Sequence, residues 1–404
     1  MRLFWQEMKK IWRPGILAAI ILIGVMFYWV RPELYLRYYG GHRPSYQLAA
    51  EWAEKYGPTM EQSERDELDA QLAEEKETFA QLIANIPEAV EAGLTDYDTF
   101  VAFMEDHHDR IISSTDMDNS YSHSEDFTQH ERLIRHIQGG TNYERIEDLD
   151  RFLYLYDLAI EEPTSSWKYF LTEYTPQEQA RILELEAMDQ RGYLPETSTT
   201  AYFRYLSIWN IMGVILLLSP TLVRDRLRRV RSMQWSSRTG RRVLNTQIMA
   251  GLASSLLFSA ISTAVYSALF LANGVLIFRD FPLYNSARDF PWFDMTYGQY
   301  ILALVWLALL AGLITGALTL LLSHYSGNYV SMLLKAVPLF LVLWIAVSIL
   351  EDSILFFHRT YLLSGDLILY WPKGLELVLF ALLLALGLGL CTRTCARQKK
   401  KELL

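Results

Sequence analysis

The clearest candidates for chemistry are a run of acidic and histidine side chains. Glu105, Asp106, His107, His108 and Asp109 are ligand types that zinc and copper take in proteins. Side chains of adjacent helical residues point about 100° apart, so consecutive residues do not converge on one ion. We interpret the run as a solvated polar stretch, with a zinc or copper site as the alternative, and we predict no metal site.

The chain has only two cysteines, Cys391 and Cys395, four residues apart at the end of the last apolar run. On a helix this spacing places both thiols on one side, where they could bind a metal or be palmitoylated. We favour two incidental thiols at a membrane edge. Residues 31–205 contain no cysteine, so the fold of that segment cannot depend on a disulfide.

Catalytic motifs are missing from the sequence. It has no Gly-x-x-x-x-Gly-Lys-Ser/Thr phosphate loop and not one Gly-Lys pair, so no ATP site is recognisable. It also lacks a His-Glu-x-x-His zinc helix and a Gly-x-Ser-x-Gly nucleophile elbow. We predict no catalytic residues and no cofactor.

Apolar runs long enough to cross a bilayer dominate the rest of the chain, since a span needs about 20 mostly apolar residues. The first follows a basic N-terminus but precedes no small-residue cleavage site, so we interpret it as an uncleaved span rather than a signal peptide. The six runs are 16–30, 206–223, 243–278, 299–322, 332–350 and 374–391. The third is long enough to suggest a tilted helix or one that extends into water.

Charge is divided unevenly. Residues 31–205 hold 36 acidic and 15 basic side chains, a net charge of −21, whereas the remainder holds 10 acidic and 22 basic, a net of +12. Cytoplasmic loops carry an excess of Lys and Arg. The basic segments 1–13, 224–242 and 393–401 all fall on one side of a six-span protein. We therefore expect a multi-pass protein of the inner or plasma membrane, with cytoplasmic N- and C-termini.

The acidic segment would then be a large extracytoplasmic domain between the first two spans. Helical periodicity over 60–86 and cap residues at 95–98 predict helices there. Further helices are predicted over 132–137, 146–159 and 176–188. The expected fold is an all-α integral membrane protein: a six-helix bundle with a large, mostly α-helical domain inserted between spans 1 and 2. The expected parts are 1–30 (interfacial helix and first span), 31–205 (outer domain) and 206–404 (spans 2–6).

Small residues recur in the third and fourth spans. Small residues allow helices to approach closely in lipid, where packing drives association. We interpret them as internal packing of the bundle, with a dimer seam or a substrate wall as alternatives. The seam residues are Gly251, Ser255, Ser259, Gly312 and Gly316.

The loop at 224–242 is rich in arginine, and its middle is amphipathic. The arginines orient the neighbouring spans. The exposed Met233, Gln234 and Trp235 offer an apolar anchor for a cytoplasmic partner. A short helix lying on anionic lipid is the competing interpretation.

This layout resembles the permease subunits of type-2 ABC transporters, especially those of Gram-positive bacteria. The segment 233–242 (MQWSSRTGRR) resembles the segment that follows span two in that family, and 250–264 resembles the small-residue span that comes next. The stretch 3–12 (LFWQEMKKIW) resembles its interfacial N-terminal helix, and 354–372 its short re-entrant helices. The likeness covers about 1–30 and 206–395.

The resemblance implies a permease that dimerises with itself or a paralogue and exports an amphipathic peptide, lipid or drug. A separate ATP-binding cassette subunit would dock on the Arg-rich loop and supply the energy. The implied contact residues are Arg228, Arg231, Met233, Gln234, Trp235, Arg238 and Arg241. The other expected partner is the lipid bilayer, and no nucleic acid is expected.

The alternative function is a membrane sensor or scaffold whose outer domain binds a ligand or a protein. A sensor usually needs only two spans around its outer domain, which leaves four spans unexplained. A membrane enzyme is a further possibility, but no catalytic set supports it.

Overall fold

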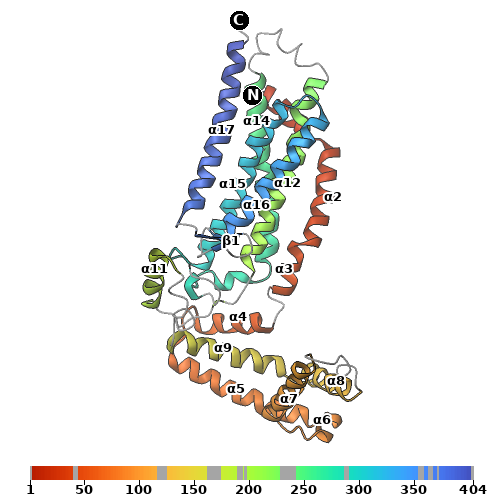
Figure 1. Cartoon of the computed structure of the whole chain (residues 1–404), viewed down its shortest axis with the longest axis vertical. Coiled ribbons are helices and arrows are strands. Elements are labelled where there is room, and N and C mark those ends of the chain that lie inside the picture. The colour runs from red at the N-terminus through yellow and green to blue at the C-terminus, as the bar shows by residue number, and fades with distance from the viewer. Residues whose placement is uncertain are drawn as a thin grey trace. The chain divides into compact units, whose positions relative to one another are not determined.

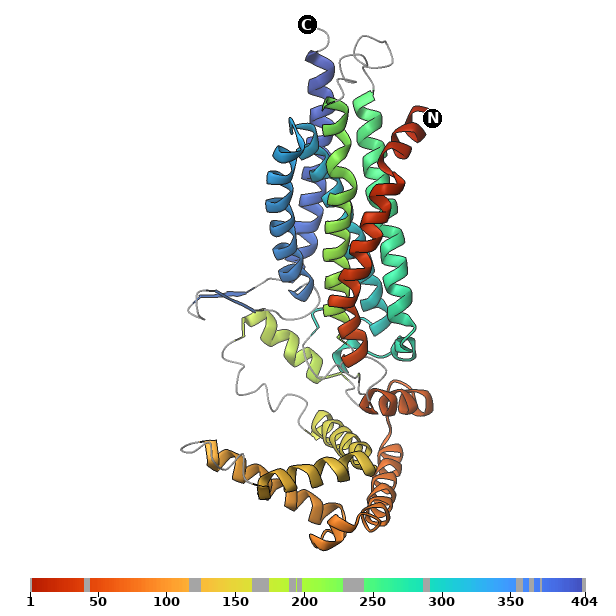
Figure 2. The ribbon, with the colours of Figure 1, turned by 90° about the vertical axis from the view of Figure 1, so that its right-hand side faces the viewer.

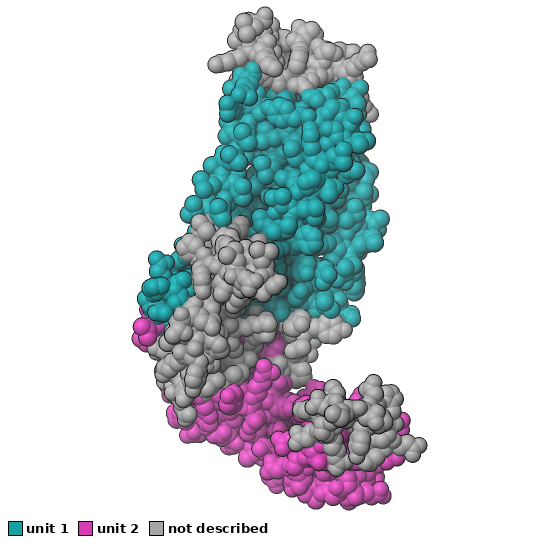
Figure 3. Space-filling view, viewed as in Figure 1, with its two compact units in different colours: residues 1–42, 174–182, 196–404 teal, residues 43–173, 183–195 magenta. Residues whose placement is uncertain are grey.

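The computed structural model describes residues 2–39, 44–115, 125–161, 174–188, 194, 198–227, 243–285, 291–353, 359–362, 367–370 and 373–401. The chain divides into two compact units (Figure 3). Unit 1 contains 1–42, 174–182 and 196–404, and unit 2 contains 43–173 and 183–195. Unit 1 thus includes both ends of the segment 31–205 that was predicted as one outer domain.

Among the described residues, unit 1 holds six helices that are long and apolar enough to cross a membrane, the number that the apolar runs predict. An amphipathic helix, α1 (Arg2–Ile11), precedes them, and α3 (Pro32–Tyr39) extends the first span. In Figure 1 α1 lies at the same end of the bundle as the C-terminal end of the last span. The spans are α2 (Pro14–Val30), α12 (Thr199–Leu227), α14 (Val243–Leu271), α15 (Tyr297–His324), α16 (Tyr329–Ser353) and α17 (Leu375–Lys401).

Helix α12 is the core of the bundle. In its most apolar stretch, 78% of the residues are buried, whereas the share in the first span is 6%. Helix α12 packs on α14, α15 and α16. The first span lies along α12 (Figure 2), where Phe27 stacks on Trp209 with ring centroids 5.7 Å apart. Large apolar side chains cover the outside of the bundle, such as Trp306 (65% exposed) and Leu334 (71% exposed). Such an apolar surface is costly in water and is expected in lipid.

The third span is shorter than its apolar run predicts. Helix α14 ends at Leu271, and Gly274 follows with φ +80°. A left-handed residue cannot continue an α-helix, and glycine adopts that conformation without steric cost. The remaining apolar residues form the 3₁₀ turn η4 (Val275–Phe278), so a single helix over 243–278 is wrong.

The named secondary-structure elements in the described part of unit 2 are all helices. Most of its core lies in two groups of buried side chains, one around Phe79 and Phe100 and one around Trp52 and Phe152. The helices predicted from periodicity are present, although the first ends at Ile83 rather than at residue 86. Its helices are α4 (Pro44–Tyr56), α5 (Gln62–Ile83), α6 (Pro87–Glu91), α7 (Tyr97–Thr115), α8 (Glu125–Gly140) and α9 (Tyr143–Glu161).

One helix, one 3₁₀ turn (η5, Leu283–Asn285) and two strands complete the described elements. Helix α11 (Pro176–Glu186) begins as predicted, with the backbone N–H of Thr175 donating to Glu178 Oε2 at 2.7 Å. Strands β1 (Arg359–Leu362) and β2 (Leu367–Tyr370) pair antiparallel, with Arg359 opposite Tyr370. The re-entrant helices expected over 354–372 are therefore wrong for these eight paired residues. Their sequences, RTYL and LILY, are rich in aromatic and branched residues that favour strands.

Candidate functional site: the roots of the arginine-rich loop

The predicted contact residues for an ATP-binding subunit lie outside the described residues. They are Arg228, Arg231, Met233, Gln234, Trp235, Arg238 and Arg241. Both roots of the loop are described, however: α12 ends at Leu227 and α14 begins at Val243. The geometry of these roots shows how the loop is attached to the bundle.

Helix α1 crosses both roots and is hydrogen-bonded to each. The guanidinium of Arg224, in the last turn of α12, donates to the backbone carbonyl of Lys10 at 3.1 Å. The amide of Gln247, in the second turn of α14, donates to Glu7 Oε2 at 3.4 Å and to Asp225 Oδ2 at 2.8 Å. We call these five residues the loop-root cluster: Glu7, Lys10, Arg224, Asp225 and Gln247.

Charge within the loop-root cluster is balanced. Lys10 Nζ lies 2.6 Å from Glu7 Oε1 and 4.0 Å from Asp225 Oδ2. Glu7 is only 2% exposed. A buried carboxylate is strongly destabilising unless it is paired, so removing one partner would leave an uncompensated charge. The cluster therefore fixes the positions of α1, α12 and α14 relative to one another at the loop roots.

The buried face of α1 also packs against α14 closer to the middle of that helix. Ser254 Oγ donates to Met8 Sδ at 3.1 Å, and the indole N–H of Trp12 lies 3.1 Å from the same hydroxyl. Ile11 is buried on this face, whereas Trp5, on the opposite face, is 61% exposed. This two-sided character is what an interfacial helix requires, and it agrees with the amphipathic helix expected at 3–12.

A second connection on the same side of the bundle involves Arg226. Its guanidinium donates to the carbonyls of His324 at 2.6 Å and Ser326 at 2.8 Å. These carbonyls belong to the end of α15 and the turn after it, so the turn between α15 and α16 is tied to the last turn of α12. One turn of α12 thus contacts three neighbouring elements through Arg224, Asp225 and Arg226.

The five predicted seam residues lie together between α14 and α15. A Cβ added at Gly312 would lie 2.8 Å from Ser259 Cβ, and one at Gly316 would lie 2.5 Å from Ser255 Cβ. Gly251 lies against Leu320, one turn further along each helix. The contacts fall at intervals of four residues on both helices, so the seam is an antiparallel contact inside one chain. The alternatives of a dimer seam or substrate wall receive no support from these contacts.

A buried polar group that the sequence analysis missed lies beside this seam. Asn210 is fully buried at the middle of α12. Its amide donates to Thr263 Oγ1 and to the carbonyl of Ala308, each at 3.1 Å, and its carbonyl accepts from Ser262 Oγ at 2.6 Å. A lone Asn inside an apolar span was the available signal, since polar residues within spans usually face other helices.

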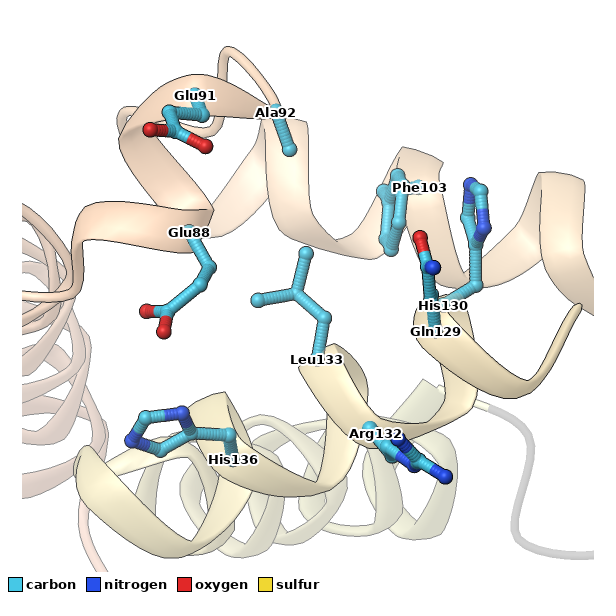
Figure 4. Close-up of a pocket in the computed structure, with 9 residues that line it drawn as sticks. All are labelled: Glu88, Glu91, Ala92, Phe103, Gln129, His130, Arg132, Leu133 and His136. Carbon is cyan, nitrogen blue, oxygen red and sulfur yellow. The ribbon is translucent and has the colours of Figure 1, made fainter. Parts of the chain in front are cut away.

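Unit 2 contains a cavity of about 440 Å³ between α6, α7 and α8 (Figure 4). Both charge signs face it, which suits a small polar ligand. His107 lies nearby and is only 7% exposed, with its ring parallel to that of His130 at 6.1 Å. The prediction that residues 105–109 are solvated is therefore wrong for His107. The lining residues are Glu88, Glu91, Ala92, Phe103, Gln129, His130, Arg132, Leu133 and His136.

Among the described residues, no group of three or more His, Cys, Asp or Glu side chains is arranged to hold a metal ion. Cys391 and Cys395 are not joined in a disulfide, and Cys391 is buried. Its Sγ lies 3.6 Å from the carbonyl of Ala317, so it is a contact between α17 and α15. A packed thiol of this kind is not placed for palmitoylation.

Comparison of the chain with protein-family models, with curated proteins and with solved structures found no match.

Proposed function

We propose that this chain is the membrane-spanning permease subunit of an ABC transporter, driven by a separate ATP-binding subunit that docks on the arginine-rich loop. The single observation that supports this most strongly is the loop-root cluster. A docking loop transmits force only if its ends are held by rigid elements. Here both ends are held by α1 and by each other through Glu7, Asp225 and Gln247.

A movement of the ATP-binding subunit would reach the bundle through α12. This helix is the most buried of the six spans and contacts α14, α15 and α16. Displacement of the loop would therefore move the centre of the bundle rather than its edge. The close seam between α14 and α15 favours rigid-body movement of that pair, because tightly packed interfaces shift between discrete arrangements rather than deform.

The proposed topology places α1, the arginine-rich loop and the C-terminal end of α17 in the cytoplasm, and unit 2 outside the cell. The excess of Lys and Arg in these segments supports that orientation. A dimer with a second copy or a paralogue belongs to the same proposal. Helices α2, α16 and α17 have mostly exposed apolar faces, which are available to lipid or to such a partner. The proposed cargo is an amphipathic peptide, lipid or drug moved outward.

Copurification tests the proposal directly. Gently solubilised chain from its native host should retain a soluble ATPase that carries a phosphate loop. Replacing Trp235 and Arg238 together by Ala should weaken that association without reducing membrane insertion. A matched control replaces Trp5 and Arg2, an exposed Trp and an exposed Arg on α1, and should leave the association intact. If the wild-type chain purifies alone and stimulates no ATPase, the transporter proposal fails.

The cavity of unit 2 favours a second candidate, a membrane sensor whose outer domain binds a small polar ligand. Its supporting observation is the set of polar and charged groups that line one cavity, which includes Glu88, Arg132 and His136. A sensor predicts that the copurifying protein is not an ATPase and that filling the cavity, for example by Leu133→Trp, abolishes its response. The permease proposal predicts that the ATPase copurifies with both the wild-type chain and the Leu133→Trp variant.

A further inference from the structure

A groove of about 300 Å³ lies between α15, α16 and α17, towards the end of the bundle that carries α1. Its two ends differ in chemistry. The inner end is walled by leucines, including Leu318 and Leu339. The outer end is formed by Tyr325, Arg393 and Arg397. The groove is therefore amphipathic along its length, in a region flanked by exposed apolar side chains.

Helix register explains why the arginines meet the groove. Leu390, Arg393, Thr394 and Arg397 follow a spacing of three, one and three residues, which places them on one face of α17. Two guanidinium groups four residues apart on a helix repel each other. Neither arginine forms a hydrogen bond or ion pair with another of the described residues, and the groove lining contains no Asp or Glu. The described residues thus leave this repulsion uncompensated.

A third positive charge is hydrogen-bonded to a residue that lines the groove. Lys335 Nζ of α16 donates to the carbonyl of Tyr325 at 3.1 Å and lies 3.4 Å from Ser326 Oγ. Two hydroxyl groups add hydrogen-bonding capacity, since Tyr325 Oη and Thr394 Oγ1 are 3.4 Å apart at the same place. Arginine, lysine and hydroxyl groups gathered in this way recognise phosphate.

We propose that this groove is a binding site for an anionic phospholipid. The phosphate lies between Arg393 and Arg397, and an acyl chain follows the leucine wall. Charge complementarity selects the headgroup, and the position of the groove at the end of three membrane spans selects a lipid over a soluble phosphate. Basic pockets between membrane helices are recognised sites for anionic lipid headgroups. This site does not depend on the proposed transport function.

Bound lipid would have a mechanical effect on α17. This helix contacts α15 through Gly387 and Cys391, which both lie against Ala317. A lipid bridging Arg393 to the leucines of α15 and α16 would extend that contact to the end of the span. We expect the lipid to hold α17 against the bundle.

Native mass spectrometry of the full chain, released from nanodiscs of phosphatidylglycerol and phosphatidylcholine in equal amounts, tests the site. Wild-type chain should retain phosphatidylglycerol in preference to phosphatidylcholine. Each arginine that contacts the bound phosphate contributes about fivefold in affinity, so Arg393→Gln with Arg397→Gln should reduce phosphatidylglycerol retention about 25-fold. The control removes two exposed basic residues from the same side of the membrane, Arg2→Gln with Lys9→Gln, and should retain wild-type preference.

Two further measurements separate the groove from general surface charge. Leu339→Trp fills the apolar end and keeps both arginines, so it should also lose the retained phosphatidylglycerol. Inorganic phosphate at millimolar concentration should not displace the lipid, because it has no acyl chain to occupy the leucine wall. Equal retention by the arginine double variant and its control would overturn the proposal, as would a wild-type chain with no preference for phosphatidylglycerol. Displacement by inorganic phosphate would also overturn it, because the site would then be one for a soluble anion.

Discussion

Ser259 of α14 lies directly against Gly312 of α15, and a Cβ placed on Gly312 would come within 2.8 Å of Ser259 Cβ. The hydroxyl of Ser259 is buried and has no hydrogen-bond partner among the described residues. The serine is therefore a small spacer at this point rather than a polar link. Close backbone approach, not hydrogen bonding, accounts for the contact between the two spans here.

Substitution of Gly312 by Ala tests this contact. Overpacking of a filled site costs about 1–3 kcal/mol, so we expect a lower thermal midpoint for the solubilised chain. The matched control is Gly389→Ala in α17, where an added Cβ meets no atom within 4 Å. It should be neutral or slightly stabilising. Ser259→Gly, combined with Gly312→Ala, should restore much of the lost stability, and failure of both effects would contradict the seam.

The docking of α1 can be tested by cross-linking. Met8 Sδ and Ser254 Oγ are 3.1 Å apart, so cysteines at 8 and 254 should be joined by a short bifunctional thiol reagent, which spans the length that Met8 loses when it is replaced by Cys. The background replaces Cys391 and Cys395 by Ser, and the linked peptides are identified by mass spectrometry. A cysteine at Trp5, on the exposed face of the same helix, serves as the control and should not link to one at Ser254. Equal linking of both pairs would show that α1 is not held in this register.

Local sequence signals predicted much of the fold. The six spans follow from apolar runs of bilayer length, and α11 begins at Pro176 as predicted. Gly274 shows where such signals mislead. An apolar run predicts burial, but the left-handed backbone at one glycine ends the helix seven residues before the run itself ends at Phe278.

The loop-root cluster could not be predicted from the sequence. Glu7 and Gln247 are 240 residues apart, and each resembles an ordinary polar residue near the end of a span. They pair because α14 begins at the same end of the bundle as α1. That arrangement depends on how the helices assemble and not on the local sequence. Asn210 was closer to being predictable, because a lone amide in an apolar span needs partners from other helices.

Replacement of Asn210 tests whether its hydrogen bonds hold three spans together. Interhelical hydrogen bonds in membranes contribute about 0.6 kcal/mol on average and up to about 1.7, so Asn210→Ala should cost about 1–3 kcal/mol once the cavity is included. Asn210→Asp should lower stability further, because a carboxylate oxygen would replace the donating NH₂ group and lie against the carbonyl oxygen of Ala308. The measurement is the thermal midpoint in detergent. Ser219→Ala is a mild control, since that hydroxyl bonds only within α12. A midpoint for Asn210→Asp at or above wild type would contradict the assigned amide orientation.

Acid should weaken the start of α7. The backbone N–H of Thr99 donates to Asp96 Oδ1 at 2.9 Å, and Thr95 Oγ1 donates to Oδ2 at 2.9 Å. These hydrogen bonds lower the pKa of Asp96 below its ordinary value. A lowered folded-state pKa gives stability that is present above the ordinary aspartate pKa and is lost as the pH falls through the lowered one.

Hydrogen exchange of the first-turn amides of α7 measures the effect of this cap. Loss of an N-cap costs about 1 kcal/mol, so Asp96→Ala should speed exchange about fivefold relative to wild type at neutral pH. The difference should shrink once the pH lies below the pKa of Asp96, because the wild-type carboxyl is then protonated too. Asp96→Asn keeps an accepting oxygen and should exchange like wild type at neutral pH, without the acid-dependent change. Equal exchange of Asp96→Ala and wild type at neutral pH would show that the cap does not hold this turn.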